Sequence, residues 1–167
     1  MTAALLNWDS GGPTPPDTAA NDDSCELKRS TTPPTVLVVE DEVLIRATVC
    51  DYLRGCGYRV LEAATGEEAQ AVFGRHDAGG SDASGSDAID ILFSDVQLGP
   101  GINGFTLASW VRQHHPGVRI VLASGVARLS QEAEHLCDGE FLTKPFSHSR
   151  LAAQINALLD KAGRKRD

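Results

Sequence analysis

Residues 36–42 read Val-Leu-Val-Val-Glu-Asp-Glu, so four apolar residues are followed directly by three acids. A continuous run of β-branched and aliphatic residues predicts a parallel strand that is buried on both faces. Apolar residues then recur at helical spacing until Gly55, at Ile45, Val49, Tyr52 and Leu53. The stretch therefore predicts a buried strand, an acidic turn and a helix in succession.

The same alternation continues along the chain. Further strands are predicted at residues 58–61, 89–93 and 118–123, and a last strand begins at Phe141-Leu142. Further helices are marked by the capping box of residues 65–68, by Leu107, Ala108 and Val111, by Val126, Leu129, Ala133 and Leu136, and by Leu151, Ile155, Leu158 and Leu159. Five strands alternating with five helices predict an α/β fold, a doubly wound parallel sheet covered on both faces.

Polar residues stand where four of the five predicted strands end. Glu40 and Asp41 follow the first strand, Asp95 the third, Ser124 the fourth and Lys144 the fifth. Ligands of such sheets collect beyond the carboxyl ends of the strands, so we expect these side chains to converge. Crowded carboxylates repel one another unless a divalent cation lies among them. Oxygen ligands of this kind suit Mg²⁺.

These residue types predict phosphoryl chemistry. A carboxylate beside Mg²⁺ can attack a phosphoryl group and form an acyl phosphate, while a cation and hydrogen-bond donors stabilise the transferring oxygens. Asp95 would be the nucleophile, Lys144 the cation and Ser124 the donor. Acids and hydroxyls at strand ends are often only helix caps, so the prediction depends on their occurring together.

At four places the chain closely resembles the receiver domain of bacterial two-component response regulators. The matching segments are residues 36–42, 93–95, 122–125 and 141–146, and the resemblance covers about residues 35–162. It implies a flavodoxin-like, CheY-like fold, with a five-stranded sheet of strand order 2-1-3-4-5 and five helices. It also implies a phosphoacceptor signalling protein of a two-component phosphorelay.

The resemblance assigns a role to each site residue. Asp95 would accept a phosphoryl group from a histidine kinase or a histidine phosphotransfer protein. Mg²⁺, the implied cofactor, would be held by the carboxylates of Asp41 and Asp95, by the backbone carbonyl of Gln97 and, through water, by Glu40. Lys144 would pair with the phosphoryl oxygens.

The resemblance also implies a switch. Ser124 would turn toward the phosphoryl group, and Phe141 would reorient with it. The peptide bond between Lys144 and Pro145 is expected to be cis, an isomer essentially confined to bonds that precede proline. The downstream protein partner would bind the surface of helix 4, strand 5 and helix 5. A phosphorylation-dependent dimer is left open.

Two features depart from the simplest receivers. Asp95 and Gly104 stand one residue further apart than expected, with Gly99-Pro100-Gly101 between them, and residues 77–88 form a flexible loop insertion. Two alternatives to a phosphoacceptor are a Mg²⁺-dependent aspartyl-phosphate phosphohydrolase and a receiver-like scaffold that is never phosphorylated. The hydrolase usually needs a second acid where Gln97 stands, and the scaffold usually lacks the nucleophile or the lysine. We therefore expect no enzyme activity beyond self-phosphorylation from a donor and autodephosphorylation.

The ends of the chain have a different composition. Residues 1–34 are rich in Pro, Thr, Asp and Gly and predict a disordered N-terminal arm before a receiver domain at residues 35–162. Residues 163–167 form a basic tail. Only a few residues follow the last predicted helix, so a stand-alone receiver without an output domain is expected.

Charge, hydropathy and cysteine spacing indicate which partners and which cellular location to expect. A formal net charge of -8 argues against direct nucleic-acid binding, because a phosphate backbone repels such a surface. No apolar run approaches the roughly 20 residues that span a bilayer, so membrane insertion is not expected. The four cysteines show no metal-binding spacing, and Cys50 and Cys56 are interpreted as reduced packing residues. A cytoplasmic location is expected.

Overall fold

The computed structural model describes residues 32–78, 88–126 and 135–163. Its strands are β1 (Thr35–Val39), β2 (Arg59–Ala63), β3 (Ile91–Asp95), β4 (Arg119–Ser124) and β5 (Leu142–Thr143). Its helices are α1 (Val43–Gly55), α2 (Gly66–Ala78), α3 (Gly104–His114) and α5 (His148–Gly163). None of the described helices is both long enough and apolar enough to cross a membrane.

The five strands form one parallel sheet in the order β2-β1-β3-β4-β5. The predicted sheet, with its strand order, is confirmed. The register brings the strand ends close together, because Val39 pairs with Ser94 and Asp95 pairs with Ala123. The turns that follow β1, β3 and β4 therefore leave the same edge of the sheet.

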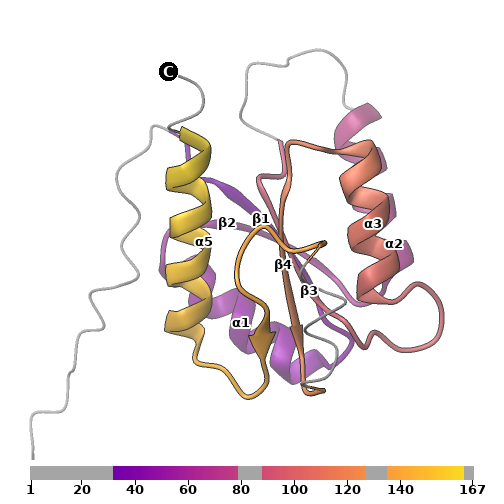
Figure 1. The fold of residues 1–167 in the computed structure, drawn as a ribbon, viewed down its shortest axis with the longest axis horizontal. Coiled ribbons are helices and arrows are strands. Elements are labelled where there is room, and N and C mark those ends of the chain that lie inside the picture. The colour runs from indigo at the N-terminus through magenta and orange to yellow at the C-terminus, as the bar shows by residue number, and fades with distance from the viewer. Residues whose placement is uncertain (1–31, 79–87, 127–134, 164–167) are drawn as a thin grey trace, which may run out of the picture.

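Helices cover both faces of the sheet, α1 and α5 on one side and α2 and α3 on the other (Figure 1). Alternate residues of β1 supply the two faces. Leu37 and Val39 belong to the core beneath α2 and α3, whereas Val36 and Val38 belong to the core beneath α1 and α5. All four are completely buried, as a strand covered on both faces requires.

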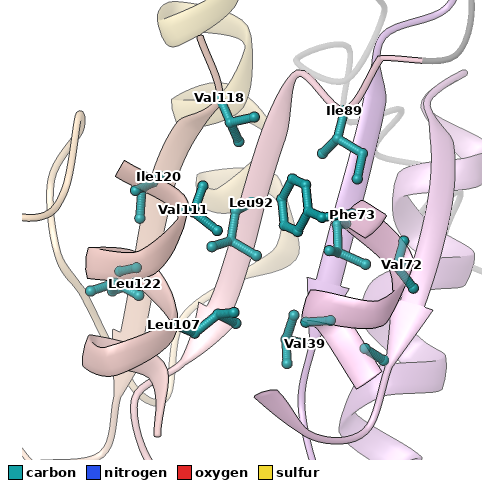
Figure 2. Packing of buried hydrophobic residues seen from close by; sticks show 14 of the residues in the cluster. Val39, Val72, Phe73, Ile89, Leu92, Leu107, Val111, Val118, Ile120 and Leu122 are labelled. Atoms are coloured by element: carbon teal, nitrogen blue, oxygen red, sulfur yellow. The ribbon is translucent and has the colours of Figure 1, made fainter. Parts of the chain in front are cut away.

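Figure 2 shows the core on the α2 and α3 side, where Leu92 and Leu122 of the sheet meet Phe73 of α2 and Val111 of α3. Burying one such side chain stabilises the fold by about 1.5–3 kcal/mol. This packing fixes the strands laterally, and it is what holds the polar residues at the strand ends in a constant position.

The helix starts follow from local hydrogen bonds. The Thr65 hydroxyl accepts from the Glu68 amide at 3.1 Å, and the Glu68 carboxylate accepts from the Ala64 amide at 2.7 Å. This is the predicted capping box, except that Glu68 reaches back one residue further than usual. The Ser147 hydroxyl accepts from the Arg150 amide at 3.2 Å, as expected of the residue before α5.

Four of the five strands, β2 to β5, begin one or two residues later than predicted, and hydrogen bonds explain two of these shifts. Ile89 was expected to open β3, but the Asp90 carboxylate accepts from the Thr35 amide at 2.8 Å. That side-chain bond occupies the amide at the start of β1, so β3 begins at Ile91. The amide of Tyr58 bonds to the carbonyl of Leu53 at the end of α1, so β2 begins one residue later.

Several other predictions concern residues outside the described ranges. The predicted fourth helix, marked by Val126, Leu129, Ala133 and Leu136, falls mostly on residues outside the described ranges, which contain four helices. Most of residues 1–34, 77–88 and 163–167 likewise lies outside them, although α2 continues to Ala78 and α5 to Gly163. Cys50 has a free thiol, but the expectation of a reduced Cys56 is wrong, because Cys56 is disulfide-bonded.

Candidate functional site

Polar side chains from three strand ends meet at the carboxyl edge of the sheet. Glu40 and Asp41 follow β1, Asp95 is the last residue of β3, and Lys144 directly follows β5. Glu40 and Asp95 are buried, whereas Asp41 is exposed and Lys144 is partly buried. Two of the three acids in the site are therefore buried, and the third is exposed to solvent.

One ammonium joins the two buried acids. The Nζ atom of Lys144 lies 2.7 Å from Oε2 of Glu40 and 2.6 Å from Oδ2 of Asp95. Charge-assisted hydrogen bonds of this length are stronger than neutral ones. Removing either kind of charge would leave the other buried without compensation.

Burial and ion pairing shift the pKa values of Glu40 and Lys144 in opposite directions. Burial raises the pKa of Glu40, although its hydrogen bond to Lys144 opposes the shift. Burial alone would lower the pKa of Lys144, but its hydrogen bonds to Asp95 and Glu40 outweigh burial and raise it. Lys144 is thus held as a cation at neutral pH.

Three carboxylates are close enough to share one cation. Oxygen atoms of Glu40, Asp41 and Asp95 all lie within 4.8 Å of one another. An all-oxygen set that includes an exposed acid leaves room for water and fits the preferences of Mg²⁺. The acidic cluster of these three residues can therefore hold a magnesium ion.

The loop after β3 returns to the nucleophile candidate. The amide of Gln97 donates to Oδ1 of Asp95 at 3.1 Å, so Gln97 lies beside this carboxylate. A Cβ atom on Gly99 would lie 3.7 Å from Oδ2 of Asp41, which places that glycine at the border of the acidic cluster.

The remaining predicted residues lie further from the carboxylates. Ser124 is completely buried at the end of β4, and its hydroxyl accepts from the Val126 amide at 3.1 Å. Phe141 is partly buried against the core and precedes β5 rather than opening it. The Lys144–Pro145 peptide bond is cis, the isomer that the resemblance implies.

Two residues near the site were not predicted from the sequence. Arg46 of α1 donates to the backbone carbonyl of Glu40 at 2.6 Å, and this hydrogen bond stabilises the acidic turn. The Ser94 hydroxyl donates to the carbonyl of Asp95 at 2.8 Å within buried β3. A long cation one helical turn after an acidic turn was the available signal for Arg46, whereas a serine inside an apolar run gave none.

A parallel sheet in this order, with the acidic cluster and a lysine at its carboxyl edge, defines a receiver-like α/β protein. A family model described as the response regulator receiver domain matches residues 36–156. The chain belongs to this family, whose members bind Mg²⁺ at an acidic pocket and act as phosphoacceptor signalling domains in two-component systems. The family interacts with histidine kinases and phosphotransfer proteins.

Solved structures agree on the fold. A CheY-like receiver domain protein from Methanospirillum hungatei JF-1 has a TM-score of 0.67 at 22% identity, covering 80% of this chain and 99% of that chain. A receiver protein from Sinorhizobium medicae WSM419 has a TM-score of 0.64 at 26% identity, over 80% and 99%. Response regulator TrrA from Thermotoga maritima, in complex with Mg(2+)-BeF, has a TM-score of 0.62 at 26% identity, over 75% and 98%.

Similarity to curated proteins is confined to part of each relative. Sensor kinase CckA of Brucella abortus is 36% identical over 129 residues, which are 76% of this chain and 13% of CckA. The probable transcriptional regulatory protein TcrX of Mycobacterium tuberculosis is 29% identical over 133 residues, which are 78% of this chain and 52% of TcrX. The chain thus spans only a fraction of these relatives.

Proposed function

We propose that Asp95 is the phosphoacceptor of this receiver domain, which we assign to residues 35–162. In the proposed reaction a carboxylate oxygen of Asp95 attacks the phosphorus of a phosphohistidine, the P–N bond breaks, and the imidazole leaves with the electron pair. The carrying observation is the position of Asp95 at the end of β3, within the acidic cluster and 2.6 Å from the ammonium of Lys144.

Magnesium would be held by the carboxylates of Asp41 and Asp95 and by the backbone carbonyl of Gln97, with Glu40 acting through water. The cation would offset the negative charge of the acidic cluster and of the phosphoryl oxygens. The spacing of the carboxylates and the place of Gln97 beside Asp95 support this assignment. Glu40 is suited to an indirect role because its carboxylate is buried and paired with Lys144.

Lys144 and Ser124 would bind the phosphoryl oxygens. A phosphoryl group adds about 1.5 to 2 negative charges and three strong acceptors at Asp95. Lys144 already contacts Asp95, so it needs little movement, whereas Ser124 must exchange its bond with Val126 for one with the phosphoryl group. That exchange would move the start of the connection between β4 and β5.

Phe141 would carry the change outward. It is partly buried next to β5, so it can turn inward where the movement of Ser124 makes room, because an aromatic ring gains from burial. Partners would then bind the surface formed by β5, α5 and the segment between β4 and β5. The switch would be a population shift between two packings, and a dimer is one form that the output can take.

The same proposal covers activity and location. The chain would transfer a phosphoryl group to itself from a histidine kinase or phosphotransfer protein and lose it by autodephosphorylation, with no further substrate. A cytoplasmic location belongs to the proposal as well.

Intact-mass spectrometry after incubation with acetyl phosphate and Mg²⁺ tests the proposal. Wild type should gain one phosphoryl group that is labile in base, and Asp95→Asn should gain none. Asp51→Asn is a matched control, because Asp51 is an exposed acid on α1. Phosphorylation of Asp95→Asn at the wild-type level would place the phosphoacceptor elsewhere.

A further inference from the structure

The loop between β3 and α3, residues 96–103, includes the extra residue noted in the sequence, within Gly99-Pro100-Gly101. Two glycines and an additional residue make a chain segment that loses much conformational freedom when it is ordered. Gly101 has φ of 112°, a backbone conformation that glycine adopts without strain. The loop therefore needs contacts that fix its path.

The first half of the loop borders the acidic cluster. Gln97 donates its amide to Asp95, and Gly99 lies next to Asp41. Any shift of this segment would change both the hydrogen bond to the nucleophile candidate and the space beside the exposed acid.

The second half of the loop lies on the first turn of α2. The amide of Ile102 donates to Oε1 of Glu67 at 2.9 Å, across 35 positions of sequence. The surfaces are in close contact, since a Cβ atom on Gly66 would lie 2.6 Å from the carbonyl oxygen of Ile102. A Cβ atom on Gly101 would lie 3.1 Å from Cδ of Glu67 and would collide with Oε1.

The Glu67 carboxylate is stabilised in this position as an anion. Backbone hydrogen bonds from its own amide and from Ile102 lower the pKa of Glu67. A carboxylate in the first turn of a helix is also favoured by the helix dipole. Glu67 can therefore accept the Ile102 hydrogen bond throughout the neutral pH range.

We propose that Glu67 is a positioning residue of the acidic cluster, which holds the long β3–α3 loop so that Gln97 and Gly99 stay beside Asp95 and Asp41. This inference rests on the proposed function, in which the backbone carbonyl of Gln97 binds Mg²⁺. A loop that is already fixed presents that carbonyl at a smaller entropic cost of binding. Glu67 acts through the loop and touches none of the proposed metal ligands.

Two measurements on the full chain test this role, Mg²⁺ titration followed by amide NMR and hydrogen exchange of the Ile102 amide. Glu67→Ala should weaken Mg²⁺ binding by roughly 3- to 10-fold, less than the 10- to 100-fold loss usual for a direct partner of a metal ligand. The Ile102 amide should exchange faster. Glu67→Gln should stay near wild type, because its amide oxygen still accepts a hydrogen bond.

Glu68→Ala is the matched control. It removes a carboxylate of the same charge from the same helical turn, but Glu68 bonds to Ala64 and not to the loop. Equal weakening in Glu67→Gln and Glu68→Ala would show that only charge matters and would overturn the inference. Unchanged Mg²⁺ affinity and unchanged Ile102 exchange in Glu67→Ala would also overturn it.

The two proposals fail separately. A wild-type chain that binds Mg²⁺ but gains no phosphoryl group would overturn the proposed function, while the Mg²⁺ and exchange measurements would still decide the role of Glu67. Amide spectra of Glu67→Ala and Glu68→Ala that keep the dispersion of the folded wild type would show that a difference between them comes from the loop and not from loss of the fold.

Discussion

The ammonium of Lys144 lies 2.6 Å from Asp95, although 49 positions separate the two residues in the chain. The same ammonium lies 2.7 Å from Glu40, which is 104 positions away. One cation thus compensates two carboxylates that arrive from two different strands. The charge balance of the acidic cluster depends on Lys144 more than on any local feature of β1 or β3.

Lys144→Ala should destabilise the fold in a pH-dependent way. The variant leaves Glu40 buried without its cation, at a cost of about 2 kcal/mol at neutral pH. Burial already raises the pKa of Glu40, and loss of Lys144 should raise it further. A group with a raised folded-state pKa contributes stability fully below its unfolded pKa and loses that contribution as the pH rises through the folded value.

The deficit of Lys144→Ala relative to wild type should therefore shrink as the pH falls from 7 toward the ordinary glutamate value of 4.5. Urea unfolding at several pH values measures it. Lys161→Ala, an exposed lysine in the last turn of α5, is the control and should show no such dependence. A deficit that grows on acidification would contradict the assignment.

Mg²⁺ should bind weakly to the wild-type chain and more weakly to Asp41→Asn. The mutual repulsion of Asp41 and Asp95 favours a cation between them, and the variant removes both that repulsion and one charged ligand of the cation. Amide signals near Glu40, Asp41, Asp95 and Gln97 should shift on titration. Asp51→Asn should titrate like wild type, and an absence of shifts at millimolar metal would remove the basis of the site.

Gly104→Ala should displace Asp95. A Cβ atom there would lie 2.8 Å from Cα of Val96 and would collide with the carbonyl oxygen of Asp95. We expect a loss of about 1–3 kcal/mol from overpacking, together with reduced phosphorylation. Gly74→Ala in α2 is the control, because nothing lies within 4 Å of its Cβ position. It should gain roughly 0.5–1 kcal/mol, since alanine is the better helix residue.

Beryllofluoride, a phosphoryl mimic, should perturb amides beyond the immediate site. In wild type we expect shifts at Phe141 and in α5 as well as near Asp95. Ser124→Ala should keep the shifts near Asp95 and lose those at Phe141, because it lacks the hydroxyl that couples the two. Ser109→Ala on α3 should behave like wild type. Shifts confined to neighbours of Asp95 in wild type would refute this coupling.

Much of the fold was predictable because β1 and β4 are buried runs with no polar interruption. Each strand must be covered on both faces, and the alternation with helices then leaves few topologies. The acids and the lysine could be assigned to one edge for the same reason. Their convergence follows from parallel strands, without any knowledge of distances.

Other features depend on side-chain and loop geometry that composition does not encode. The Asp90 carboxylate moved the start of β3 because it bonds to an amide 55 positions away. Arg46 bonds to a backbone carbonyl of Glu40, and any residue type at position 40 would offer that carbonyl. The Glu67 contact depends on the path of a loop whose length alone was visible in the sequence.

The two edge strands of the sheet, β2 and β5, determine how readily another copy of the chain can pair with it. An open strand edge is a template for pairing with another copy of the chain. β5, at one margin, is only two residues long, so it offers few free amide and carbonyl groups. β2, at the other margin, exposes the charged residues Arg59 and Glu62. Both margins of the described sheet thus offer a poor template for edge-to-edge pairing with another copy of the chain.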